Sequence, residues 1–136
     1  MNDVVINKIQ SIQRCIQRAR EEYNLAGDSF KKNHTHQDAA ILNITRACEQ
    51  TIDLANYVIK NKKYGIPTQS RDSFDFLVEH GLITSELAEK LVKMTGFRIT
   101  AVHQYQKLDI DIVINIIKKD LDDLIKFCDL ILDFLQ

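Results

Sequence analysis

Hydrophobic residues in this chain recur every three or four positions, which is the spacing of one face of an α-helix. A single apolar stripe between about residues 3 and 23 predicts a first helix, with Asp3 at its start. A second stripe between about residues 36 and 62 predicts another long helix. We expect Thr35 to cap this helix and Asp38 to act as a weak capping-box partner. The segment between the stripes is polar and is predicted to be a connector.

The second half of the chain begins with a break around Pro67. Ser70 is well placed to start a short third helix that ends near residue 79, before Gly81. Thr84 or Ser85 can cap a fourth helix, which runs on to about residue 103. No apolar periodicity follows in residues 104–108, so we expect this helix to end there.

The last predicted helix runs from about residue 109 to residue 135 and has a wide apolar face. One stripe consists of Ile110, Ile114, Ile117, Leu121, Leu124, Cys128, Ile131 and Leu135. The other consists of Ile112, Ile116, Phe127, Leu130 and Phe134. Such a face is wider than a surface helix of a small bundle needs. Either the second stripe packs against another chain, or the helix lies at the centre of a five-helix bundle.

Composition agrees with an all-α fold. The chain has 136 residues, which fits a single domain spanning residues 1–136, and 45% of them are hydrophobic. It contains one Pro and four Gly, so few residues interrupt long helices. The formal net charge is −1, which excludes a general basic coat for nucleic acids. Any RNA contact must come from a local patch, and the candidates are Lys60, Lys62, Lys63, Lys90, Lys93 and Lys107.

The remaining features indicate a soluble cytoplasmic protein. Cys15, Cys48 and Cys128 are odd in number and lie in apolar stretches, so we expect buried thiols rather than disulfides. The N-terminus does not have the pattern of a signal peptide, and no stretch is apolar enough to span a membrane. Lys31, Lys32, His34 and His36 form a basic spot in the connector. We expect no metal site at these histidines and no bound cofactor.

The segment 98–105 carries the candidate chemistry. Arg98 is a fixed cation suited to phosphate, and His103 can carry a proton near neutral pH. They lie about 140° apart around an ideal helix, so they do not share a face. Either the helix ends near residue 102, or the long Arg98 side chain bends round, or the two groups act across chains. Together these two side chains are the minimum set for cutting RNA without a metal. One histidine, however, cannot act as both base and acid in the same cleavage step. A symmetric dimer supplies two, which is a reason to expect the site between chains.

The spacing Arg98-x4-His103-x-Tyr105 resembles the motif of HEPN-domain ribonuclease toxins of the HepT type, which are encoded beside a nucleotidyltransferase antitoxin. The resemblance covers nearly the whole chain and is specific from about residue 67 to 105. It also rests on Gly65, Pro67, Ser70, Arg71, Asp72, Ser73, Phe74, Leu77, Gly81, Leu82, Ile83, Leu87, Ala88, Leu91, Lys93, Met94, Gly96 and Phe97. The family commonly has Asn directly after the Arg, where this chain has Ile99.

The resemblance implies an all-α, HEPN-like bundle of about five helices, with two long antiparallel helices and a dimeric state. It implies a toxin of a type VII-like toxin–antitoxin pair that cleaves RNA without metal. Arg98 and His103 would form a composite site at the dimer interface, and AMPylation of Tyr105 by the nucleotidyltransferase would silence it. It also favours the second stripe of the last helix as the dimer interface. The alternatives are a non-catalytic, substrate-binding companion of a nucleotidyltransferase and a plain dimeric scaffold.

Overall fold

The computed structural model describes residues 3–135, which form helices joined by short turns and contain no strand. The helices are α1 (Asp3–Ala26), α2 (His34–Lys62), α3 (Ser70–Glu79), α4 (Ser85–His103), α5 (Ile110–Asn115) and α6 (Leu121–Leu135). Two 3₁₀ turns, η1 (Gly27–Lys32) and η2 (Tyr105–Lys107), follow α1 and α4, and the π-helical turn η3 (Ile116–Asp120) joins α5 to α6. The predicted all-α bundle with two long antiparallel helices is confirmed.

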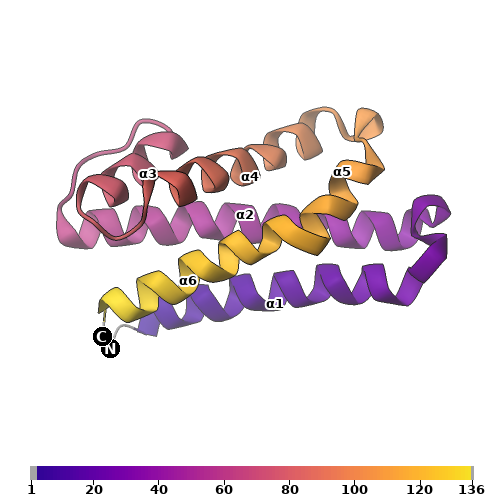
Figure 1. The fold of residues 1–136 in the computed structure, drawn as a ribbon, viewed down its shortest axis with the longest axis horizontal. Helices are drawn as coiled ribbons and strands as arrows, with labels where there is room; N and C mark the ends of the chain where they lie inside the picture. Colours follow the sequence, from indigo (N-terminus) through magenta and orange to yellow (C-terminus); the bar gives the residue numbers. More distant parts are fainter. Residues whose placement is uncertain (1–2, 136) are drawn as a thin grey trace.

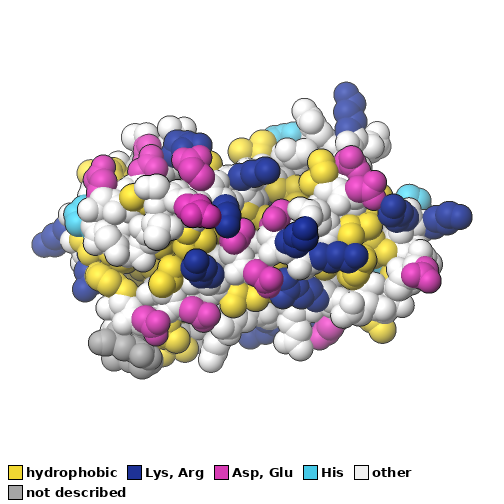
Figure 2. Space-filling view, viewed as in Figure 1, with side chains coloured by type: hydrophobic (Ala, Val, Ile, Leu, Met, Phe, Trp, Pro, Cys, Tyr) yellow, Lys and Arg dark blue, Asp and Glu magenta, His cyan; other side chains and the backbone are white. Residues whose placement is uncertain are grey.

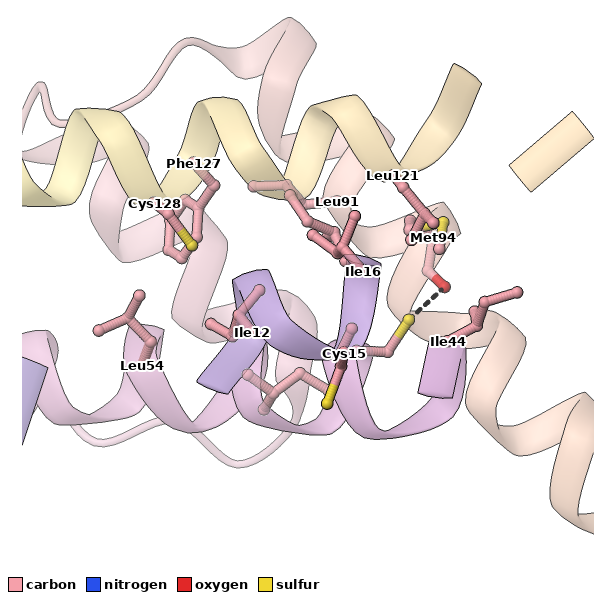
Figure 3. Close-up of a cluster of buried hydrophobic side chains, with 14 of the residues drawn as sticks. Ile12, Cys15, Ile16, Ile44, Leu54, Leu91, Met94, Leu121, Phe127 and Cys128 are labelled. Atoms are coloured by element: carbon pink, nitrogen blue, oxygen red, sulfur yellow. Dashed lines mark hydrogen bonds between the residues drawn. The ribbon is translucent and has the colours of Figure 1, made fainter. Parts of the chain in front are cut away.

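The bundle is built around the antiparallel pair α1 and α2 (Figure 1). Helix α4 packs against α2, and the last helix crosses the front of the molecule in contact with α1, α2 and α4. Burial of one apolar stripe from each helix forms a continuous hydrophobic core. Figure 3 shows part of this core, in which side chains from α1, α2, α4 and α6 meet. None of the helices in the described residues is long and apolar enough to cross a membrane.

The junction between α1 and α2 differs from the prediction. Helix α1 continues to Ala26, and the turn that follows is anchored by Phe30, which is buried against the ring of Tyr23 with 5.0 Å between the ring centroids. Helix α2 begins at His34, and Asn33 is its N-cap, accepting a hydrogen bond from the backbone N–H of His36 at 3.2 Å. The prediction of Thr35 as the N-cap was therefore wrong, because an equally good capping residue precedes it by two positions.

Helix α4 agrees with the prediction at both ends. The hydroxyl of Thr84 accepts a hydrogen bond from the backbone N–H of Leu87 at 3.1 Å and caps the start. The helix ends at His103, and the backbone N–H of Gln104 donates to the carbonyl of Thr100 at 2.8 Å. Residues 98–103 are therefore helical throughout, which fixes the directions in which their side chains leave the backbone.

The last helix is interrupted by the π turn η3, which the sequence did not reveal. A π turn adds one residue to a helical turn and so rotates the following segment. Ile116 and Ile117, the first two residues of this turn, are both buried. The turn is tied to α1 by Arg20, whose Nε donates to the carbonyl of Ile117 at 3.0 Å and whose guanidinium pairs with Asp122 at 2.9 Å.

The second apolar stripe of the last helix is only partly exposed. Phe127 is fully buried and packs edge-to-face on Phe74, with 5.8 Å between the ring centroids. Ile116 is also in the core, whereas Ile112 and Phe134 are exposed. The stripe is therefore divided between core and surface. The expectation that it forms one continuous surface for a partner was wrong in this respect, because Phe127 lies one turn from the buried core residues Leu124 and Ile131.

All three cysteines are free and buried, as predicted. Burial raises the pKa of the Cys48 and Cys128 thiols to about 12, so both are neutral thiols near pH 7. The Cys48 Sγ donates to the backbone carbonyl of Met94 at 3.4 Å, marked by the dashed line in Figure 3, which links α2 to α4.

Candidate active site

Arg98 and His103 project from the C-terminal third of α4. Arg98 is half-buried on the side of α4 that faces α2, where its positive charge partly opposes the effect of burial on the pKa of Cys48. Arg98 forms no ion pair within residues 3–135, so its charge is available to a ligand. His103 is the exposed last residue of the helix. Because the helix is regular, about 140° separates the two side chains around its axis.

Two exposed apolar residues fill the arc between Arg98 and His103. Val102 lies about 40° from Arg98 around the helix and Ile99 about 100° from it, before His103 at about 140°. Their exposed fractions are 63% for Val102 and 54% for Ile99. An arginine and a histidine therefore flank an apolar strip on the surface of α4.

Leu42 of α2 extends this strip. Two contacts fix how the antiparallel helices α2 and α4 lie against each other: Cys48 bonds to Met94, and Asp38 bonds to Tyr105 just beyond the end of α4. Leu42 lies between Asp38 and Cys48 in α2 and is exposed, so it lies alongside the C-terminal part of α4. We refer to Leu42, Ile99 and Val102 as the motif patch.

Tyr105 is the first residue of η2, and its hydroxyl donates a hydrogen bond to the carboxylate of Asp38. The ring is partly exposed, and no residue of η2 is buried. Asp38 was predicted to be a weak capping-box partner, whereas it lies in the second turn of α2 and contacts Tyr105 instead. The two residues are 67 positions apart, so no local spacing could have indicated this contact.

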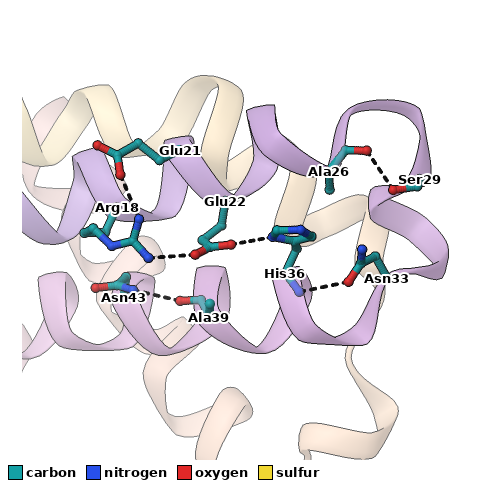
Figure 4. Close-up of polar contacts among 9 residues, drawn as sticks. All are labelled: Arg18, Glu21, Glu22, Ala26, Ser29, Asn33, His36, Ala39 and Asn43. Atoms are coloured by element: carbon teal, nitrogen blue, oxygen red, sulfur yellow. Dashed lines mark hydrogen bonds and ion pairs between the residues drawn. The ribbon is translucent and has the colours of Figure 1, made fainter.

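Two residues of the predicted basic spot in the connector, Lys31 and His36, are paired with acidic residues of the chain. His36 is bonded to Glu22 of α1, which also accepts from Arg18 at 2.6 Å (Figure 4). Hydrogen bonds from His36 and then from Arg18 hold the pKa of Glu22 below its usual value. Lys31 pairs with Asp111 at 2.9 Å. Within residues 3–135 no three His, Cys, Asp or Glu side chains are grouped to hold a metal ion.

A groove of about 670 Å³ lies between α4 and the segment α5–η3. Its lining combines apolar side chains, among them Met94 and Phe97, with Lys90, Lys93, Lys107 and Lys119. Figure 2 shows this face, on which lysines and acidic residues alternate around exposed apolar atoms. The acidic residues Asp109, Asp120 and Asp123 also line the groove. Three of the lysines predicted to contact RNA, Lys90, Lys93 and Lys107, thus lie together, but carboxylates surround them. Two others, Lys60 and Lys63, line a separate pocket beside Pro67.

The sequence of this chain matches a known protein family and two relatives from other organisms. The model of the family described as ribonuclease HepT-like matches residues 12–131. The chain is 47% identical over 131 residues to the mRNA nuclease HepT of Shewanella oneidensis, covering 96% of this chain and 98% of that protein. It is 29% identical over 94 residues to a putative RNase of Archaeoglobus fulgidus, covering 69% and 70% of the two chains.

Solved structures agree with these sequence matches. The tri-AMPylated HEPN toxin of Shewanella oneidensis, in complex with an MNT antitoxin, superimposes with a TM-score of 0.90 at 46% identity, covering 96% of this chain and 98% of the other. A toxin–antitoxin structure with AMP-PNP gives a TM-score of 0.90 at 45% identity over 96% and 99% of the two chains. The cytosolic protein YutE of Bacillus subtilis shares the fold, with a TM-score of 0.72 at 21% identity over 93% and 89%.

Proposed function

Because the chain belongs to the ribonuclease HepT-like family, we propose that it is the toxin of a type VII-like toxin–antitoxin pair and cleaves RNA without a metal ion. Arg98 and His103 are the proposed catalytic residues, and the site is composite, formed by two copies of the chain. The cognate antitoxin is a nucleotidyltransferase that silences the toxin by AMPylating Tyr105. The proposed place of action is the cytoplasm, where RNA and ATP are available.

The arrangement of Arg98 and His103 on α4 carries this proposal. The two side chains leave the helix on opposite flanks of an exposed apolar strip, so one chain cannot aim both at a single phosphate without bending the arginine round the helix. Ile99, Val102 and Leu42 give the chain an apolar surface to bury at that place. Packing the motif patch against its copy gathers two arginines and two histidines around one contact.

This set of side chains matches the requirements of RNA cleavage. One histidine takes the proton from a ribose 2′-hydroxyl, which attacks the adjacent phosphorus. The histidine of the second chain donates a proton to the leaving 5′-oxygen. The arginine forks donate hydrogen bonds to the non-bridging oxygens, on which negative charge grows in the transition state. Well-placed proton transfer contributes roughly 10²–10⁴ to the rate.

AMPylation of Tyr105 explains silencing in physical terms. Tyr105 lies two residues beyond His103, so a group attached to its oxygen stays near the proposed site. Its phosphodiester brings a negative charge that competes with RNA for Arg98, and the adenosine takes up space. The similarity to the tri-AMPylated toxin in complex with an MNT antitoxin supports this assignment.

The direct test is cleavage of RNA by the purified chain in the presence of EDTA. We expect cleavage by the wild type and loss of at least 10²-fold in the rate with His103→Ala. Arg98→Lys should also lose most activity, since lysine keeps the charge but not the planar fork. Arg14→Lys, on the exposed side of α1, is the matched control and should cleave normally.

The outcomes separate the proposed toxin from its alternative. Full activity of both variants would remove Arg98 and His103 from the mechanism. A wild type that does not cleave RNA but is AMPylated on Tyr105 by its nucleotidyltransferase would indicate the non-catalytic companion instead.

A further inference from the structure

We propose that Asp38 positions the Tyr105 hydroxyl and accepts its proton during AMPylation, so that the toxin supplies part of the chemistry of its own silencing. This inference rests on the proposed AMPylation of Tyr105. The observation behind it is the hydrogen bond from the Tyr105 hydroxyl to the carboxylate of Asp38, which links η2 to α2.

The position of Asp38 suits this role. Asp38 is exposed in the second turn of α2, and its carboxylate forms no ion pair with a lysine or arginine of residues 3–135. The rigid helix also holds the carboxylate in place, whereas the three-residue turn that carries Tyr105 buries none of its own side chains. Asp38 thus fixes a phenol that little else restrains.

The transfer step balances with Asp38 as the acceptor. The Tyr105 oxygen attacks the α-phosphorus of ATP, and a bond forms between that oxygen and phosphorus. The bond from the α-phosphorus to the oxygen that bridges to the β-phosphate breaks, and pyrophosphate leaves with the electron pair. The phenolic proton passes to Asp38, which returns it to water. A carboxylate is a weak base toward a phenol, so the proton moves only as the new bond forms.

Modification then removes the contact that prepared it. The AMPylated Tyr105 oxygen has no proton to donate, and its phosphodiester anion lies beside the Asp38 carboxylate. The phosphodiester and the Asp38 carboxylate are both negatively charged and repel each other. The hydrogen bond that links η2 to α2 is therefore lost once Tyr105 is modified.

The rate of AMP incorporation tests the proposal, with purified chain, the cognate nucleotidyltransferase, Mg²⁺ and labelled ATP. Asp38→Asn keeps the size and an acceptor oxygen but takes up no proton, and we expect a rate on the order of 10²-fold lower. Asp38→Glu keeps the carboxylate and should recover part of the rate. Asp53→Asn, at an exposed position of the same helix, is the control and should incorporate AMP at the wild-type rate.

A second measurement separates proton transfer from a purely structural role. Replacing Tyr105 with difluorotyrosine gives a more acidic phenol, which needs less help from a base. The ratio of the rate with Asp38 in place to the rate of the Asp38→Asn variant should therefore shrink several-fold. An unchanged ratio, or equal rates for Asp38→Asn and the wild type, overturns the proposal.

Two controls keep the result interpretable. Circular dichroism shows whether Asp38→Asn is folded; if it is not, the difluorotyrosine comparison is made with Asp38→Ser, which also lacks the carboxylate. A wild type that incorporates no AMP on Tyr105 would instead contradict the proposed function, whatever the Asp38 variants do.

Discussion

At the scale of single residues, the site divides into what the sequence could predict and what it could not. Arg98, His103 and Tyr105 occur within eight positions, so their spacing was visible directly. The end of α4 at His103 was also predictable, because apolar periodicity stops there. The partner of Tyr105 was not, because Asp38 meets it only after α2 and α4 have packed together.

Tyr105→Phe keeps the aromatic ring and removes the oxygen that would accept AMP. We expect the purified variant to cleave RNA and to incorporate no AMP, so that the nucleotidyltransferase no longer silences it. Mass spectrometry of the peptide containing residue 105, before and after incubation with the antitoxin and ATP, provides the measurement. Tyr57→Phe, near the C-terminal end of α2, is the control and should still be silenced. A Tyr105→Phe chain that is silenced by an AMP group at another position would contradict the assignment.

At the scale of elements, the last helix shows why a sequence pattern can mislead. Its two apolar stripes were assigned on the assumption of a regular helix, and η3 breaks that regularity between Ile116 and Asp120. Neither a Pro nor a Gly lies in the turn, so the sequence contains no local signal for it. The N-cap of α2 is a similar case: Asn33 and Thr35 are both good capping residues, and the structure starts the helix at the first of them.

Phe127→Ala should destabilise the bundle by about 3–5 kcal/mol, because it leaves a cavity beside Phe74 in the core. Phe134→Ala, in the same helix, removes an exposed ring whose contact is with the Lys62 ammonium at 5.4 Å from the ring centroid. That change should cost about 1 kcal/mol or less. Urea denaturation of both variants gives the free energies of unfolding. Equal losses would mean that Phe127 is not the core residue described above.

The junction of α1 and α2 should be sensitive to acid. The pKa of Glu22 is lowered in the folded chain, so this carboxylate stabilises the fold above its usual value near 4.5, and the contribution is lost as the pH falls through the folded value. Glu22→Gln should destabilise the chain by about 1–2 kcal/mol at neutral pH, and the difference from the wild type should narrow below about pH 4.5.

Glu21→Gln is the matched control for this experiment. Glu21 also pairs with Arg18, but its side chain is 44% exposed against 13% for Glu22. A surface pair of this kind contributes about 0–1 kcal/mol. The measurement is the thermal stability of the three proteins between pH 3 and pH 7. A difference in stability between the wild type and Glu22→Gln that widens in acid would contradict the lowered pKa of Glu22.

At the scale of the whole molecule, the structure changes where a second chain should bind. The apolar pattern predicted a contact through the last helix, but Ile116 and Phe127 of its second stripe lie in the core of their own chain. The exposed apolar surface nearest to the candidate chemistry is the motif patch, which the periodicity of α4 did not reveal because Ile99 and Val102 lie within the motif itself. Surface position depends on tertiary packing, so a one-dimensional pattern cannot assign it.

Val102→Asp should prevent dimer formation and abolish RNA cleavage, because it places a charge in the proposed contact. Leu25→Asp changes an apolar residue that is 72% exposed at the C-terminal end of α1, outside the motif patch, and should do neither. Sedimentation at micromolar concentration gives the mass of each protein. A wild type that sediments as a monomer while it cleaves RNA would remove the composite site, and a dimeric Val102→Asp would move the interface elsewhere.

The opposite flanks of α4 also set how activity responds to dose. If each chain holds only part of a site, the rate of RNA cleavage follows the concentration of dimers. At protein concentrations below the dissociation constant of the dimer, this rate rises with the square of the total protein concentration. A cell could then carry a low level of free toxin at little cost, and a small increase in synthesis, or a small loss of antitoxin, would produce a steep rise in RNA damage. Inactive chains would also inhibit the wild type by forming inactive mixed dimers. When wild type is mixed with His103→Ala at constant total protein, the cleavage rate should fall with the square of the wild-type fraction. A linear decline would show that each chain works alone.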